Sequence, residues 1–72
     1  MNEKEKKERF QKIATNRTNK ILEMLRLLGN CANMSNYAYS DQDVKKIFDT
    51  IEKELTEQRI KFDKKERKRF SL

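Results

Sequence analysis

The chain contains no histidine and no proline, and it has only one glycine and one cysteine. With no histidine and a single thiol, it offers no Cys/His set for a metal ion and no internal disulfide. Cys31 has no neighbouring base to activate it, so we expect a small, half-buried residue rather than a nucleophile. We therefore predict that the protein is not an enzyme and uses no cofactor and no metal. Long helices and few turns follow from the scarcity of proline and glycine.

Long apolar runs are absent as well. The first ten residues, MNEKEKKERF, are charged and no apolar run follows them, and no window approaches the ~18 apolar residues of a membrane span. We expect a soluble, cytoplasmic protein with no membrane partner. Only 35% of the 72 residues are hydrophobic, and small domains bury proportionally little surface. A partner is therefore expected to add to the core.

The apolar residues recur at helical spacing in two segments. They predict a first helix over about residues 3–28 and a second over about residues 41–63. Gly29 stands where the first helix could end in a left-handed residue, and the acidic capping pattern SDQD, residues 40–43, marks the start of the second. The predicted fold class is all-α: a two-helix antiparallel hairpin over residues 1–63, followed by a basic C-terminal tail, 64–72. The two apolar faces consist of Phe10, Ile13, Ala14, Ile21, Met24, Leu25 and Leu28, and of Val44, Ile47, Phe48, Ile51, Leu55 and Phe62.

The apolar surface is widest at residues 21–28, where six of eight residues are apolar and sweep ~220° of the helix. The second helix has a stripe of only ~100°, with Ile60 outside it. One neighbouring helix cannot cover the wider arc. We therefore expect a second copy and a four-helix bundle, with Leu22 and Leu27 at the protein interface. The alternative is that the connector folds back over these two leucines.

The connector, residues 29–40, is longer than the ~2–8 residues usual between bundle helices. It belongs to the only stretch of the chain that is poor in charge. Tyr37 and Tyr39 are predicted interface residues: they either pack their rings against the helix ends or present a recognition loop. Local Asx-type turns are expected at the polar residues of the connector, which are Asn30, Asn33, Ser35 and Asn36.

Charge is concentrated at the two ends of the chain. Residues 1–20 carry +4, residues 21–60 carry −2 and residues 61–72 carry +4. An antiparallel hairpin would place the two basic ends side by side, where their self-repulsion favours a polyanion. The alternative is an ordinary solvated face with weak ion pairs along the helix. The predicted nucleic-acid-binding residues are Lys6, Arg9, Lys12, Asn16, Arg17, Lys20, Lys64, Lys65, Arg67, Lys68 and Arg69.

The run RLLGNCANMSNYAYSDQDVKKIFDTIEKEL, Arg26 to Leu55, resembles small helical proteins encoded on plasmids, phages and other mobile elements of low-GC bacteria. In these proteins a leucine-rich helix end, an Asn/Tyr-bearing loop and an acid-capped helix recur. The resemblance covers under half of the chain and implies a bacterial, mobile-element setting, without an activity or functional residues.

The sequence is compatible with two functions. The first is a small basic accessory protein that contacts the phosphate backbone of nucleic acid. The second is a protein-interaction module, such as an inhibitor or adaptor, that docks on a larger protein through residues 21–28 or through the connector. A homo-oligomer is expected in either case.

Overall fold

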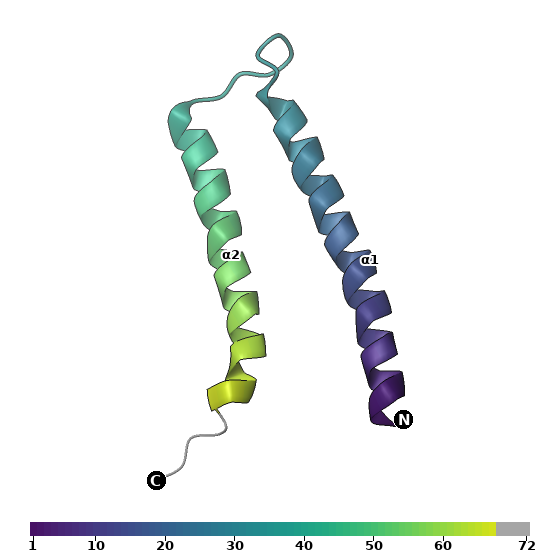
Figure 1. Ribbon diagram of the computed structural model, residues 1–72. Coiled ribbons are helices and arrows are strands. Elements are labelled where there is room, and N and C mark those ends of the chain that lie inside the picture. The colour runs from purple at the N-terminus through teal and green to yellow at the C-terminus, as the bar shows by residue number, and fades with distance from the viewer. Residues whose placement is uncertain (68–72) are drawn as a thin grey trace. The chain divides into compact units, whose positions relative to one another are not determined.

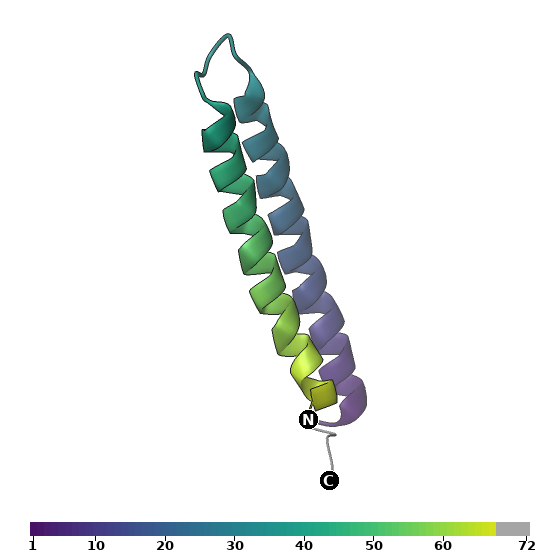
Figure 2. The same ribbon diagram turned by 90° about the vertical axis from the view of Figure 1, so that its left-hand side faces the viewer.

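The computed structural model describes the backbone of residues 1–67 and the side chains of residues 1–63. The chain divides into two units, Met1–Ala38 and Tyr39–Leu72. The first unit holds helix α1 (Glu3–Gly29) and the short 3₁₀ helix η1 (Asn30–Ala32), and the second holds helix α2 (Asp41–Arg67) (Figure 1). Residues 1–67 contain no strand, so the all-α class is confirmed. Both long helices run without a break (Figure 2).

Helix α1 begins at a capping residue that the sequence pattern had not singled out. The Asn2 side chain accepts a hydrogen bond from the Glu5 amide at 2.8 Å, and Asn2 Nδ2 donates to Glu5 Oε1 at 3.2 Å. The Lys6 amide donates to the Asn2 carbonyl at 3.0 Å. The bond from the Glu5 amide to the Asn2 side chain occupies an N–H group that has no partner inside the helix. Acids in the first turn interact favourably with the positive end of the helix dipole.

The prediction that α1 ends in a left-handed residue at Gly29 is wrong. Gly29 has φ −59° and ψ −30°, an ordinary right-handed helical conformation, and it is the last residue of α1. The chain then tightens into η1, and the Asn30 amide donates to carbonyls of the preceding turn, including that of Arg26. A 3₁₀ turn occupies the terminal carbonyls as a left-handed residue would, so the glycine is not needed for its conformational freedom.

Asn33 orders the connector that follows η1. Its side-chain Oδ1 accepts from the Ser35 amide at 3.0 Å, which confirms an Asx-type turn at this residue. Its carbonyl accepts from the amides of Asn36, at 3.1 Å, and Tyr37, at 3.0 Å. The connector is therefore hydrogen-bonded locally, although all residues from 30 to 40 are exposed.

Helix α2 begins at the predicted capping box. Ser40 Oγ accepts from the Asp43 amide at 3.1 Å, and Asp43 Oδ2 accepts from the Ser40 amide at 2.9 Å. This reciprocal pair stops the chain from extending the helix backwards and defines its first residue as Asp41. The helix continues to Arg67, four residues beyond the predicted end. Residues 68–72 of the predicted basic tail lie outside the described residues.

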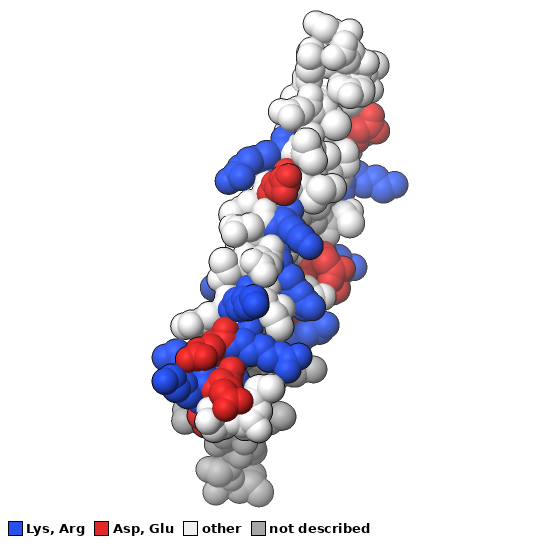
Figure 3. Space-filling model, turned by 90° about the vertical axis from the view of Figure 1, so that its right-hand side faces the viewer, with Lys and Arg blue, Asp and Glu red and all other residues white. Residues whose placement is uncertain are grey.

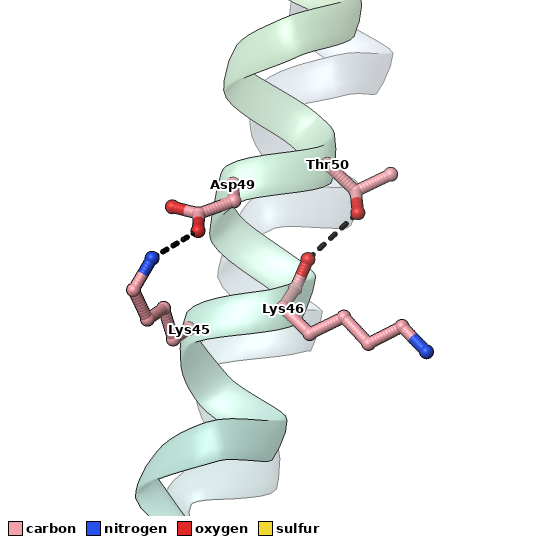
Figure 4. A network of polar contacts seen from close by, with 4 residues as sticks. All are labelled: Lys45, Lys46, Asp49 and Thr50. Atoms are coloured by element: carbon pink, nitrogen blue, oxygen red, sulfur yellow. Dashed lines mark hydrogen bonds and ion pairs between the residues drawn. The ribbon is translucent and has the colours of Figure 1, made fainter.

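Local side-chain contacts line the exposed surface of α2. Lys45 Nζ contacts Asp49 Oδ2 one turn away, and Thr50 Oγ1 donates to the Lys46 carbonyl at 2.7 Å (Figure 4). One turn further on, Gln58 Nε2 donates to Glu54 Oε2 at 2.6 Å. The two side-chain pairs, Lys45–Asp49 and Gln58–Glu54, each stabilise an exposed helix by about 0.2–0.5 kcal/mol. The Thr50 hydroxyl bonds a backbone carbonyl and adds no such gain. The two pairs support α2 without any buried contact.

No side chain among residues 1–63 is buried. The half-buried residues lie mostly on the expected apolar faces, and Ile60 is half-buried although it lies outside the stripe of α2.

Each helix carries six residues spaced alternately by four and three positions, which we call its seam. The seam of α1 is Phe10, Ala14, Arg17, Ile21, Met24 and Leu28, and the seam of α2 is Val44, Phe48, Ile51, Leu55, Gln58 and Phe62.

Candidate nucleic-acid and protein interfaces

Most of the predicted nucleic-acid-binding residues on α1 share one side of the helix. At ~100° per residue, five of them fall within an arc of about 100°, and Lys12 lies about 40° beyond its edge. All are exposed. No Asp or Glu of α1 falls within that arc, and residues 9–22 contain no acid at any position. We call this arc the basic face of α1; it consists of Lys6, Arg9, Asn16, Arg17 and Lys20.

The positive charge of the basic face is scarcely neutralised by neighbouring side chains. Residues 1–63 hold two ion pairs, Lys6–Glu3 at 3.6 Å and Lys45–Asp49. The Lys6 pair is exposed, with side-chain accessibilities of 60% and 93%, so water screens it and it contributes little. Arg9, Arg17 and Lys20 make no ion pair within residues 1–63. Within residues 1–63, the cations of this face therefore have few partners of opposite charge.

Helix α2 has a different charge pattern over its described side chains. Between residues 41 and 63 it carries five Lys or Arg and seven Asp or Glu, interleaved along the helix. Figure 3 shows blue side chains gathered below an uncharged upper end, where residues 27–40 carry no charge. In the described part of the chain, the basic face of α1 is thus the group of cations least interleaved with acids.

The second group of predicted nucleic-acid-binding residues cannot be placed in the same way. The backbone of Lys64, Lys65 and Arg67 is helical, as part of α2, but their side chains lie outside the described residues. Lys68 and Arg69 lie wholly outside them. The clustering of this group with α1 therefore stays a prediction from the sequence.

The predicted protein interface on α1 is exposed. Leu22 keeps 41% of its surface accessible and Leu27 keeps 53%, and they lie on opposite edges of the apolar arc of α1. Ile21 and Met24, between them, are also exposed. Apolar surface of this width on one helix is available to another protein segment.

The connector residues differ in how far they are covered. Tyr37 keeps 53% of its surface exposed and Tyr39 keeps 37%, so neither ring is buried. Cys31 is exposed, which corrects the expectation of a half-buried residue; its Sγ lies 3.9 Å from the Leu27 carbonyl. The thiol follows one helical turn after Leu27, and the turn of η1 leaves it at the surface.

Two features escaped the sequence-based predictions of functional residues. The first is the acid-free arc of α1, which appears only when each cation is placed around the helix. The second is the Glu54–Gln58 hydrogen bond, which the i,i+4 spacing of these residues would have indicated. Both concern charge placement, so they bear on what the helices can bind.

The residues that the structure describes contain no group of three or more His, Cys, Asp or Glu side chains that could hold a metal ion. Neither α1 nor the described part of α2 has an apolar stretch that could cross a membrane. Comparisons of the chain with protein-family models, with curated proteins and with solved structures gave no match.

Proposed function

We propose that the chain is a small basic helical protein that binds nucleic acid through the phosphate backbone. The observation that carries this proposal is the acid-free basic face of α1, whose cations are exposed and make only one weak ion pair within residues 1–63. Lys and Arg side chains that neutralise phosphates release condensed counterions, which drives binding without reading sequence. The phosphate contacts are assigned to Lys6 and Arg9 of the basic face and to Lys12 beside it, at the N-terminal end of α1.

The second part of the proposal concerns assembly. An antiparallel arrangement of α1 and α2 would bring the N-terminal cations beside Lys61 and the cations after it, and so double the positive charge at one end. The wide apolar arc at residues 21–28 supports a further contact with a second copy. In this arrangement one nucleic-acid molecule meets the basic ends of two chains. A cytoplasmic, mobile-element setting agrees with such a role.

Fluorescence anisotropy with labelled duplex DNA, single-stranded DNA and structured RNA tests the proposal. We expect binding to at least one of them at low salt, with weak sequence preference and a steep loss of affinity as salt rises. Asn16→Ala asks whether one contact is more specific, since the loss of such a contact would change the sequence preference. Absence of binding to all three at low salt would eliminate this function.

A protein-interaction module is the second candidate. It is favoured by the exposed apolar residues of α1 between Ile21 and Leu28, which are accessible in a chain that buries no described side chain. An inhibitor or adaptor could dock this segment into the groove of a larger protein. A pull-down with and without nuclease separates the two candidates, because nuclease removes partners that are held through nucleic acid.

A further inference from the structure

The seams of α1 and α2 match each other in one antiparallel register. Both alternate spacings of four and three residues, so each can lie along another helix of the same pattern. When the helices are set antiparallel with Leu28 opposite Val44, every other seam residue also meets a seam residue, and the two numbers of each pair add up to 72. The pairs are Leu28–Val44, Met24–Phe48, Ile21–Ile51, Arg17–Leu55, Ala14–Gln58 and Phe10–Phe62.

Two of the six flanking pairs within the length of the seams are complementary in this register. In an antiparallel pair, residues on the same flank of the two helices face each other across the seam. On one flank this sets Lys20 opposite Glu54, two opposite charges, and Leu27 opposite Ile47, two apolar residues. The match gives Leu27 a neighbour on α2. It leaves Leu22, on the outer edge of the arc, for any further contact.

The charged residues on this flank disfavour pairing between identical helices. An antiparallel α1·α1 pair that matches seam to seam sets Lys20 opposite Lys20 of the second helix, and the equivalent α2·α2 pair sets Glu54 opposite Glu54. Like charges opposite each other are destabilising, and such repulsion selects partners among helices with similar apolar patterns. The flanking charges therefore favour α1·α2 over either homotypic pair.

Arg17 adds a second selective contact. It is the only charged residue on either seam, and in the register above it lies within one residue of the level of Glu54, on the same flank. Glu54 Oε2 already accepts from Gln58 Nε2 at 2.6 Å within α2, so its carboxylate is held one turn from Gln58. Guanidinium and carboxylate groups form strong charge-assisted hydrogen bonds, and a single polar seam position can specify register.

We propose that α1 pairs with α2 of its own chain in this one antiparallel register, and that Lys20 and Arg17 select it through Glu54. The connector from Asn30 to Ser40 joins the two helix ends that the register sets together, which favours the same chain over a second copy. Arg17 and Lys20 then serve helix pairing, whereas Lys6, Arg9 and Lys12 remain available for phosphate.

A charge-swap cycle tests the proposed contact between Lys20 and Glu54. The measurement requires no nucleic acid, so its outcome is independent of the proposed function. Lys20→Glu and Glu54→Lys should each raise the unfolding constant, by about 2- to 10-fold, and the double variant should recover most of that loss. The matched control is Lys12→Glu with Glu57→Lys, whose positions face away from the seams and should show no such recovery. If the stability losses of the two single variants simply add in the Lys20/Glu54 double variant, the proposed Lys20–Glu54 contact is refuted.

Disulfide trapping tests the register itself. In a Cys31→Ser background, Ile21→Cys with Ile51→Cys should form a disulfide under mild oxidation and migrate as a monomer on a non-reducing gel. Ile21→Cys with Leu55→Cys is displaced by four residues, about 6 Å along the helix, and should not form one readily. Disulfide-linked dimers from the first pair would assign the partner helix to a second copy, and equal trapping of both pairs would refute the register.

Discussion

Removing three cations from the N-terminal part of α1 should weaken nucleic-acid binding far more than removing three from α2. The test variant is the triple substitution of Lys6, Arg9 and Lys12 by Gln. Each phosphate contact contributes about 0.9 to the slope of log affinity against log salt on duplex DNA. With about four to six contacts, the unsubstituted chain should show a slope of roughly −4 to −5, and the variant should lose about 2.7 of it.

The same relation gives the expected loss of affinity. At 0.1 M monovalent salt each lost contact removes about 0.9 log units, so three contacts cost about 500-fold, or roughly 3.7 kcal/mol. Titrations followed by fluorescence anisotropy at two or more salt concentrations measure both quantities. The stability of the variant should change little, because these side chains are exposed and only Lys6 has an ion pair, a weak one.

The matched control removes the same number and kind of charges from α2. Lys46, Lys53 and Arg59, replaced by Gln, also supply two lysines and one arginine, and all three are exposed and interleaved with acids. Both variants lower the net charge from +6 to +3. We expect the control to keep the steep slope. Equal losses in both variants would show that net charge alone drives binding, and the assignment to α1 would be refuted.

Three further predictions concern the apolar arc and the connector. Leu22→Glu should reduce self-association, measured by light scattering at micromolar concentration, more than Met34→Glu does in the exposed connector. A monomeric unsubstituted chain would contradict the second copy. Gly29→Ala should raise the melting temperature and increase the free energy of unfolding by about 0.5–1 kcal/mol. The reason is that Gly29 has a right-handed conformation and that an added Cβ meets nothing within 4 Å. A lower melting temperature would contradict that conformation. Tyr39→Ala should lower the melting temperature more than Tyr37→Ala does, because Tyr39 is 37% exposed and Tyr37 is 53% exposed. If both variants keep their stability but lose partner binding, the connector is a recognition loop.

Local sequence patterns were sufficient to predict the helices and the start of α2. The apolar periodicity placed α1 and α2 to within a few residues, because a repeat of 3.6 is imposed by the helix itself. The capping box at Ser40 was readable because both of its hydrogen bonds join residues three positions apart. Asn2 offers the same kind of spacing to Glu5, and it was missed because the helix was inferred from its apolar face, whose first residue is Phe10.

The ends of the helices depended on backbone geometry that residue types do not specify. Glycine accepts both left-handed and right-handed conformations, so Gly29 alone could not indicate which one ends α1, and the turn of η1 decided it. In the same way, the charged sequence after Asp63 is compatible with a helix or with a coil, and α2 continues to Arg67.

The charge excess of the two chain ends was evident from composition, since counting charges requires no coordinates. Whether those charges are available to a ligand depends on rotamers and on distances between side chains. Only the three-dimensional structure revealed that Lys6 contacts Glu3 within α1 while Arg9, Arg17 and Lys20 have no ion pair within residues 1–63. The structure likewise revealed that Leu22 and Leu27 remain exposed. Exposure is a property of the surroundings of a side chain in space, and the sequence records only its neighbours along the chain.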